Sequence, residues 1–247
     1  MICDISNMII SVLSDIMYPA TAFAITWIIV TNCFSVCDIF QPEWYKKRCI
    51  ANLEFYKPMQ VAEYFKLLAV NIKNLQLMFV LLFLCALARK CIIGDTSLIP
   101  WMFGKNLNWY IRFLIEVVGA AMWGEIWFFL AHEFAHMPQM KHWHAKHHEY
   151  SHTCYALVGL YCSWQEILLV NFPLGTGWAI LVKMDPMILS IFFIFAAWHI
   201  AHDHSAHKLI PNILDDPQRH LKHHSSRNEN YGAAWVHALF QANHNMK

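Results

Sequence analysis

The sequence contains few charged residues for its length. Of its 247 residues, 14% are charged and 57% are hydrophobic, whereas ordinary soluble domains carry about 25% charged residues. The mean hydropathy is +0.34. This composition excludes an intrinsically disordered chain and argues against a soluble globular enzyme.

The chain also lacks an excess of either charge and a pattern of paired cysteines. With 18 basic and 17 acidic residues, the formal net charge is +1, so we expect no nucleic-acid partner, which usually requires a clustered basic face. The eight cysteines form no CxxC pair and no compact secreted framework. We therefore expect reduced, mostly structural thiols rather than a disulfide scaffold.

Histidine is absent from the first 131 residues, and all 16 histidines follow from His132 onward. This asymmetry predicts an anchoring region followed by a region that carries the chemistry. We place an N-terminal membrane anchor at residues 1–110 and a histidine-rich catalytic region at residues 111–247, which includes a second membrane hairpin.

Long apolar runs favour an all-α integral membrane protein. Residues 17–36 form an uncharged run of about 20 residues, enough to cross a hydrocarbon core about 30 Å thick. The second run is 67–93. The third, 111–131, contains three charged residues and is better explained as a bundle helix with one polar side. Since Lys46, Lys47 and Arg48 follow the first run, the positive-inside rule places their loop in the cytosol.

Two shorter apolar segments, 167–182 and 187–201, are separated by Lys183, Asp185 and Pro186. This spacing predicts a helical hairpin. A large soluble helical core is the alternative, which uncharged runs of this length disfavour.

Three short motifs place histidines at helical spacing, so that the imidazoles of each motif share one face. At this histidine content, fewer than about 0.1 copies of HxxHH are expected by chance, and the sequence has two. The motifs predict metal binding. They are His132 and His136; His144, His147 and His148; and His220, His223 and His224.

Eight histidines are more than a structural zinc site needs, because such a site closes with four ligands and usually includes thiolates. Neutral imidazole suits iron, copper, nickel and zinc. The motifs therefore predict two adjacent metal centres with open positions, near the membrane surface, where a lipid can reach them without leaving the bilayer. Carboxylates that could orient the rings are Glu125, Glu133, Glu149 and Asp203.

The order HxxxH, HxxHH, long gap, HxxHH resembles the fatty acid hydroxylase and sterol desaturase superfamily of membrane di-metal oxygenases. Further elements between His132 and Gly232 are similar to sterol C4-methyl oxidases within it. They are His147-His148-Glu149-Tyr150, Glu166, Asp203-His204-Ser205 and Asn230-Tyr231-Gly232.

The resemblance implies about four transmembrane helices with a cytosolic helical cap that holds two metal ions. It adds His204 to the eight motif histidines as a ligand, and more weakly His207, with which His202 competes. The metal implied is iron, with zinc as the alternative in purified forms. The resemblance also implies the endoplasmic reticulum, O2 as oxidant, and electrons from NAD(P)H through cytochrome b5 or a related carrier and its reductase.

The sequence contains no cytochrome b5-like His-Pro-Gly-Gly element, so we expect the electron donor to be a separate protein. The function expected is hydroxylation or desaturation of a sterol or sterol-like lipid. One alternative is a fatty acyl or sphingolipid hydroxylase of the same superfamily. Another is a non-catalytic, histidine-rich membrane protein that stores or transports metal, although a transporter should place its ligands inside the spans.

Overall fold

A computed structural model describes residues 2–51, 56–94, 107–151, 154–209, 217–226 and 231–244. In this part of the chain the regular elements are all helical, and one isolated β-bridge joins Cys49 to His207. The prediction of an all-α fold is confirmed. The elements are α1 (Ile2–Phe40), α2 (Glu43–Lys46), α3 (Val61–Ile93), α5 (Trp109–His136), α6 (Lys141–His144), η1 (His147–Tyr150), η2 (Ala156–Leu160), α7 (Trp164–Glu166), η3 (Ile167–Asn171), α8 (Phe172–Val182), α9 (Pro186–Asp203), α10 (Pro217–Ser226) and α11 (Ala234–His244).

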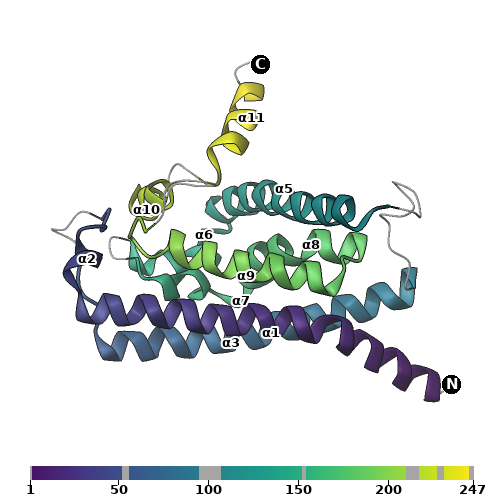
Figure 1. The fold of residues 1–247 in the computed structure, drawn as a ribbon. Coiled ribbons are helices and arrows are strands. Elements are labelled where there is room, and N and C mark those ends of the chain that lie inside the picture. The colour runs from purple at the N-terminus through teal and green to yellow at the C-terminus, as the bar shows by residue number, and fades with distance from the viewer. Residues whose placement is uncertain are drawn as a thin grey trace.

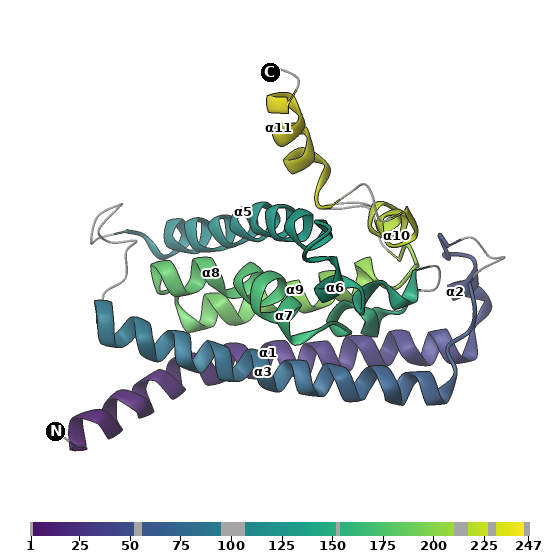
Figure 2. The ribbon, with the colours of Figure 1, turned by 180° about the vertical axis from the view of Figure 1, so that it is seen from behind.

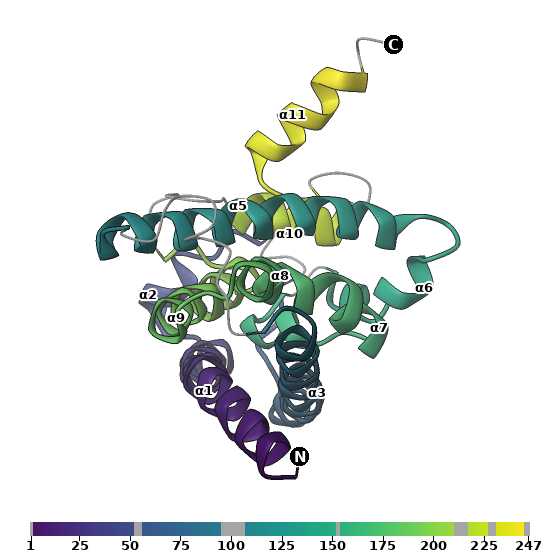
Figure 3. The same cartoon turned by 90° about the vertical axis from the view of Figure 1, so that its right-hand side faces the viewer.

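The long helices are stacked in layers, as Figure 1 shows: α1 and α3 lie side by side, α8 and α9 come next, and α5 covers them. The view from behind in Figure 2 gives the same order. Helices α2, α6 and α10 gather at one end of the stack, and Figure 3 shows α11 projecting away from the α5 side. This end contains the functional residues.

Among the described residues, five helices, rather than about four, are long and apolar enough to cross a membrane. Their outward-facing positions are large apolar side chains such as Ile29, Phe79, Val118 and Ile191, which are exposed. In a bilayer such positions contact lipid instead of water. The protein is therefore an integral membrane protein. The helices are Ile5–Phe40, Val61–Ile93, Trp109–His136, Trp164–Val182 and Pro186–Asp203.

Helix α5 is among these five although its sequence carries charges. Arg112 Nε donates to Glu116 Oε1 over 2.6 Å, and the other carboxylate oxygen of Glu116 accepts from the backbone N–H of Asp185 at 2.9 Å. Because the Glu116 side chain is fully buried, its charge is matched inside the protein and does not face lipid. The pair also ties α5 to the turn before α9.

The predicted hairpin is present as α8 and α9. Lys183 ends α8 in the left-handed conformation with φ 53°, which turns the chain back. Asp185 then begins α9, since its side chain accepts from the N–H groups of Met187 and Ile188, and Pro186 occupies the first helical position.

The short 3-10 helix η2 is buried inside the bundle, and two asparagines of α3 donate to its backbone carbonyls. Asn71 Nδ2 donates to the carbonyl of Leu157 at 2.9 Å, and Asn74 Nδ2 donates to that of Leu160 at 2.8 Å. Buried carbonyls without partners would cost free energy in an apolar interior. These asparagines therefore allow this short helix to pack beside the metal centre.

The loop between α1 and α3 lies at the same end as the histidines. The N–H of Ile50 donates to the carbonyl of Ala206, and that of Lys208 donates to the carbonyl of Arg48, both at 2.9 Å. These bonds fasten the basic loop to the turn that follows α9. Ala206 adopts a left-handed φ of 56° within this turn.

Candidate metal centre

Nine of the ten histidines predicted as ligands converge into two groups in which one ligand atom of each residue lies within 4.8 Å of the others. The groups draw on α5, α6, η1, the end of α9 and α10, so they form only when these elements pack together. The first group is His132, His136, His144, His148 and His223, and the second is His147, His204, His220 and His224.

Each HxxHH motif divides its histidines between the two groups. His147 and His148 are adjacent in sequence but belong to different groups, and so are His223 and His224. Successive residues on a helix point about 100° apart. A single turn therefore supplies ligands to both groups and keeps them side by side.

The Nε2 atoms of each group face one another at hydrogen-bond distance. In the first group, His144 Nε2 lies 2.9 Å from the Nε2 atoms of His132 and His148. In the second, His220 Nε2 lies 2.8 Å from that of His204 and 3.1 Å from that of His224. Such convergence of ring nitrogens is the arrangement expected around a cation.

The Nδ1 contacts indicate which ring nitrogen carries the proton in one histidine of each group. His132 Nδ1 donates to the carbonyl of Tyr231 at 2.9 Å, and His204 Nδ1 donates to that of Ile200 at 2.8 Å. A neutral imidazole has one N–H, so the Nε2 atoms of these two rings carry lone pairs. In each group, one ring therefore presents an Nε2 lone pair to the neighbouring ring nitrogens. This is the form that coordinates a metal ion, and the residues fit metal ions.

A buried carboxylate supports both groups from outside. Glu166 Oε1 lies 2.9 Å from Nδ1 of His144 and 3.9 Å from Nδ1 of His147, although the contacts are not aligned as hydrogen bonds. The other oxygen, Oε2, has no hydrogen-bond partner among the described residues. One acidic side chain thus lies beside a histidine of each group.

Glu166 is expected to matter for metal affinity, because carboxylates behind ligating imidazoles fix the ring orientation and raise its basicity. We expect Glu166→Gln to weaken metal binding about 10–100-fold, the usual effect of such changes. Titration of metal-stripped protein with Fe²⁺ measures this. The control is the double variant Gln165→Glu with Glu166→Gln, which keeps the carboxylate but moves it by one position and should not restore the affinity. Equal affinity of Glu166→Gln and the unmodified protein would contradict the assignment.

Burial keeps the grouped imidazoles neutral. Burial lowers the pKa of His220 and His224 well below the usual 6.5, and neighbouring imidazoles lower it further. For His204, burial lowers the pKa to about 4. Neutral rings are the form that binds metal ions.

These pKa shifts predict how the metal-stripped protein responds to acid. In the unfolded chain the imidazoles titrate near the usual value of about 6.5, so below that pH the unfolded state binds more protons than the folded state. Stability is then complete above about pH 6.5 and declines towards pH 4. Melting temperatures of the chelator-treated protein across this range test the prediction, and a flat profile would contradict it.

His207 is the one predicted ligand that the structure does not bring into either group. Its ring stacks on Tyr45 with centroids 3.5 Å apart, and Nδ1 donates to the carbonyl of Ser205 at 2.6 Å. The competing residue, His202, also lies outside both groups, with its ring stacked on Trp198. The turn after α9 thus directs only His204 towards the metal centre.

The four carboxylates that the sequence offered as partners of the ligand rings lie in different environments. Glu149 Oε2 accepts from the hydroxyl of Tyr161 at 2.7 Å, Asp203 lies 3.5 Å from Nδ1 of His199, and Glu133 is exposed. Glu125 lines the cavity beside the histidines. The carboxylate nearest to the grouped rings is Glu166, which the sequence indicated only through its resemblance to the sterol enzymes.

Sequence reasoning also missed the role of a backbone carbonyl. Tyr231 belongs to the Asn-Tyr-Gly element, and its carbonyl oxygen accepts the Nδ1 proton of His132. Asn230 lies outside the described residues. Every residue has a backbone carbonyl, so the residue type at position 231 does not predict this hydrogen bond. The one signal in the sequence was the position of the Asn-Tyr-Gly element after the last histidine motif.

A cavity of about 400 Å³ adjoins both histidine groups, within the range of about 300–1,000 Å³ typical of ligand sites. His132, His144, His147, His204 and His220 contribute to its wall. We call it the metal cavity. Exposed Met122 of α5, Phe195 of α9 and Trp235 of α11 also line it. Its exposed lining therefore lies on two membrane-length helices, α5 and α9, and on the short helix α11.

Membrane-length helices and two buried imidazole clusters define a helical membrane protein able to hold two metal ions. The sequence profile of the fatty acid hydroxylase family matches residues 117–241, just over half of the chain. The protein belongs to the fatty acid hydroxylase family of membrane oxidoreductases, and its clusters are consistent with the di-iron site of that family. Searches of curated proteins and of solved structures found no match.

Proposed function

We propose that the protein hydroxylates or desaturates a sterol or sterol-like lipid with O2 at a pair of iron ions. The observation that carries this proposal is the metal cavity, which adjoins both histidine groups and has exposed lining residues on α5 and α9. Because these helices are of membrane length, a lipid can enter sideways from the bilayer.

The bound iron ions would supply O2 activation and the oxidising power to break an unactivated C–H bond. In hydroxylation, the lipid C–H bond, one O2, two electrons and two protons give a C–OH group and one water. In desaturation, two hydrogens leave adjacent carbons, and the same inputs give an alkene and two waters. The position of the lipid carbon chain decides between these outcomes.

The protein's own residues would bind the metal ions and exclude water from the site. We propose the nine grouped histidines as the metal ligands, with Glu166 orienting His144. Phe128 packs its ring 4.7 Å from that of His132, and Leu174 adds a second apolar side chain to the metal cavity. These side chains exclude water, which strengthens electrostatic interactions in the site.

The basic residues at the metal end support a cytosolic orientation, as in the endoplasmic reticulum. Lys46, Lys47 and Arg48 are exposed, and the loop that contains them is bonded to the turn after α9. By the positive-inside rule this end faces the cytosol. A metal site on that side is accessible to a cytosolic electron donor.

We infer that the electron donor is a separate protein of the cytochrome b5 type, served by its reductase and NAD(P)H. Exposed Lys141 and Lys222 lie on α6 and α10, the short helices that supply His144, His223 and other ligands. Cations beside a redox site attract an acidic partner and raise its association rate.

The test is to express the chain in cells that accumulate methylated sterols and to analyse sterols, fatty acids and sphingolipids by mass spectrometry. A changed sterol that disappears in His147→Ala supports the proposal, and His142→Ala is the control because His142 is exposed on α6. A changed acyl lipid instead would assign the fatty acyl alternative. Full iron loading without any changed lipid would favour a non-catalytic metal-binding protein.

A further inference from the structure

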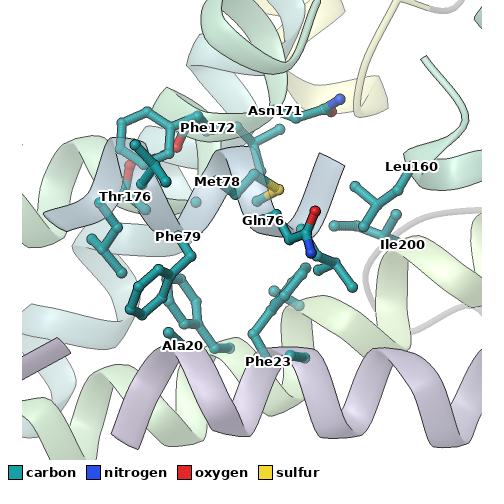
Figure 4. A pocket seen from close by; sticks show the side chains of 18 of the residues that line it. Ala20, Phe23, Gln76, Met78, Phe79, Leu160, Asn171, Phe172, Thr176 and Ile200 are labelled. Atoms are coloured by element: carbon teal, nitrogen blue, oxygen red, sulfur yellow. The ribbon is translucent and has the colours of Figure 1, made fainter. Parts of the chain in front are cut away.

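A second cavity of about 510 Å³ lies among α1, α3, α8 and α9. Figure 4 shows its side chains around an open space, with Ala20 and Phe23 of α1 on one side and Phe172 and Thr176 across from them. Gln76 of α3 ends beside this space. We call it the tail cavity.

The tail cavity opens on the surface of the membrane-length helices. Four of its lining residues are exposed, namely Thr21 on α1 and Gln76, Phe79 and Val80 on α3. All four lie near the middle of their helices rather than at the ends. In a bilayer this opening faces hydrocarbon, so lipid chains are the molecules that reach it.

The tail cavity and the metal cavity share part of their walls. Asn171, Leu174, Ala196 and Ile200 line both. The two cavities therefore meet at these residues, and two of them, Leu174 and Ile200, have side chains that can change rotamer. A molecule longer than the metal cavity can therefore extend past these residues into the tail cavity.

One of these shared residues, Ile200, also contacts the metal centre directly. Ile200 accepts the Nδ1 proton of His204 on its carbonyl oxygen at 2.8 Å. Its side chain lies over Gly159, where an added Cβ would come within 2.7 Å of Ile200 Cγ2. The absence of a side chain at position 159 is what leaves room for Ile200 between the two cavities.

We propose that the tail cavity receives the hydrocarbon part of the lipid substrate that extends beyond the metal cavity. This inference rests on the proposed function. It adds a site that takes an alkyl chain or the side chain of a sterol, while the carbon to be oxidised lies beside the histidines.

The lining of the tail cavity favours hydrocarbon over a polar head group. Most of its walls are Ala, Leu, Ile, Val, Met and Phe side chains. The polar groups deeper in the wall already have partners, since the Thr176 hydroxyl donates to the carbonyl of Phe172 and Asn171 Nδ2 donates to Cys162 Sγ. Only Gln76 and Thr21, at the opening, present polar atoms on the exposed side.

The experiment uses photoreactive lipids with the full chain in lipid nanodiscs. A fatty acid and a sterol each carry a diazirine at the alkyl end remote from the polar group, and matched probes carry it near the polar group. After irradiation, labelled residues are located by mass spectrometry. We expect the remote diazirine to label residues 20–24 or 75–82, which contribute to the tail cavity and not to the metal cavity, and the other probes to label the walls of the metal cavity.

Two variants reduce the volume of the tail cavity from opposite sides. Ala24→Phe acts from α1 and Gly175→Leu from α8, where an added Cβ meets only Phe193 Cε1 at 3.7 Å. Each should lower labelling by the remote diazirine about tenfold, the effect of withholding about two methylene groups from an apolar site. Ile25→Phe is the control, because Ile25 is exposed on α1 and does not line the cavity.

Each outcome decides between the proposals. Labelling spread over the outer faces of α1 and α3, and unchanged by Ala24→Phe and Gly175→Leu, would overturn the tail cavity. So would a loss of labelling in Gln76→Leu, because hydrocarbon needs no amide. Lipid oxidation without labelling of this cavity would refute the inference alone. Tail labelling without any oxidised lipid would refute the proposed function and leave the tail cavity as a lipid-binding site with no role in catalysis.

Discussion

A chain carrying His223→Ala is expected to bind about one metal ion where the unmodified protein binds two, and so is a chain carrying His224→Ala. The two residues are neighbours on α10, but His223 belongs to the first histidine group and His224 to the second. The double variant should bind no metal. Iron content per chain, measured by mass spectrometry on purified protein, gives the result.

Lipid oxidation should fall by more than about 100-fold in each single variant, because even changes behind a ligand cost about 10–100-fold. The physical reason is the loss of one Nε2 lone pair from a group in which neighbouring Nε2 atoms lie 2.8–3.2 Å apart. Both metal ions are required for the proposed reaction, so removing either one has the same effect on product.

Ser225→Ala is the matched control, because Ser225 follows His224 on α10 and its exposed hydroxyl bonds only to a backbone carbonyl in the same helix. It should retain both metal ions and full activity. If His223→Ala and His224→Ala each lost both ions, the two groups would form one inseparable centre. If both retained two ions, the histidine groups would not be the metal sites.

The second large effect is expected far from the metal centre, at the charged pair of α5. Arg112→Ala leaves the carboxylate of Glu116 buried without its cation, whereas the native pair is joined over 2.6 Å. Breaking a buried ion pair costs about 3–5 kcal/mol. We expect Arg112→Ala to lower the free energy of unfolding by about 3 kcal/mol. This is the lower end of the range, because the Arg112 side chain is 31% exposed.

Neutralising the carboxylate should recover most of the free energy of unfolding that Arg112→Ala loses. In the double variant Arg112→Ala with Glu116→Gln, no buried charge remains, and the amide oxygen can still accept from the N–H of Asp185. Reversible unfolding in mixed detergent micelles measures the three free energies. Equal stability of Arg112→Ala and the unmodified protein would show that Glu116 does not hold a buried charge.

Several elements could be predicted from residues alone. The five apolar runs correspond to the five membrane-length helices, because about 20 apolar residues can be buried in a bilayer only as a helix. The histidine motifs predicted metal binding, since spacing of three and four residues puts imidazoles on one helix face. The hairpin of α8 and α9 followed from Lys183, Asp185 and Pro186, which end one helix and begin the next.

Other features depended on contacts between distant segments. Glu166 comes close to His144 and His147 only because α7 packs against α6 and η1. His204 and His207 are both in the turn after α9, but only His204 points into the centre, since the left-handed Ala206 lies between them and His207 stacks on Tyr45. No spacing rule in the sequence distinguishes these two histidines.

The sequence by itself determined that this chain is a helical membrane protein with histidines arranged for metal ions, because helix periodicity and the cost of burying polar groups in lipid are local properties. Only the tertiary structure decided how the nine histidines divide into two groups, which carboxylate supports them, and where the two cavities lie. These features depend on the packing of α5, α9 and α10 against one another. Close packing brings together residues that are too far apart in the sequence for helix periodicity to relate them.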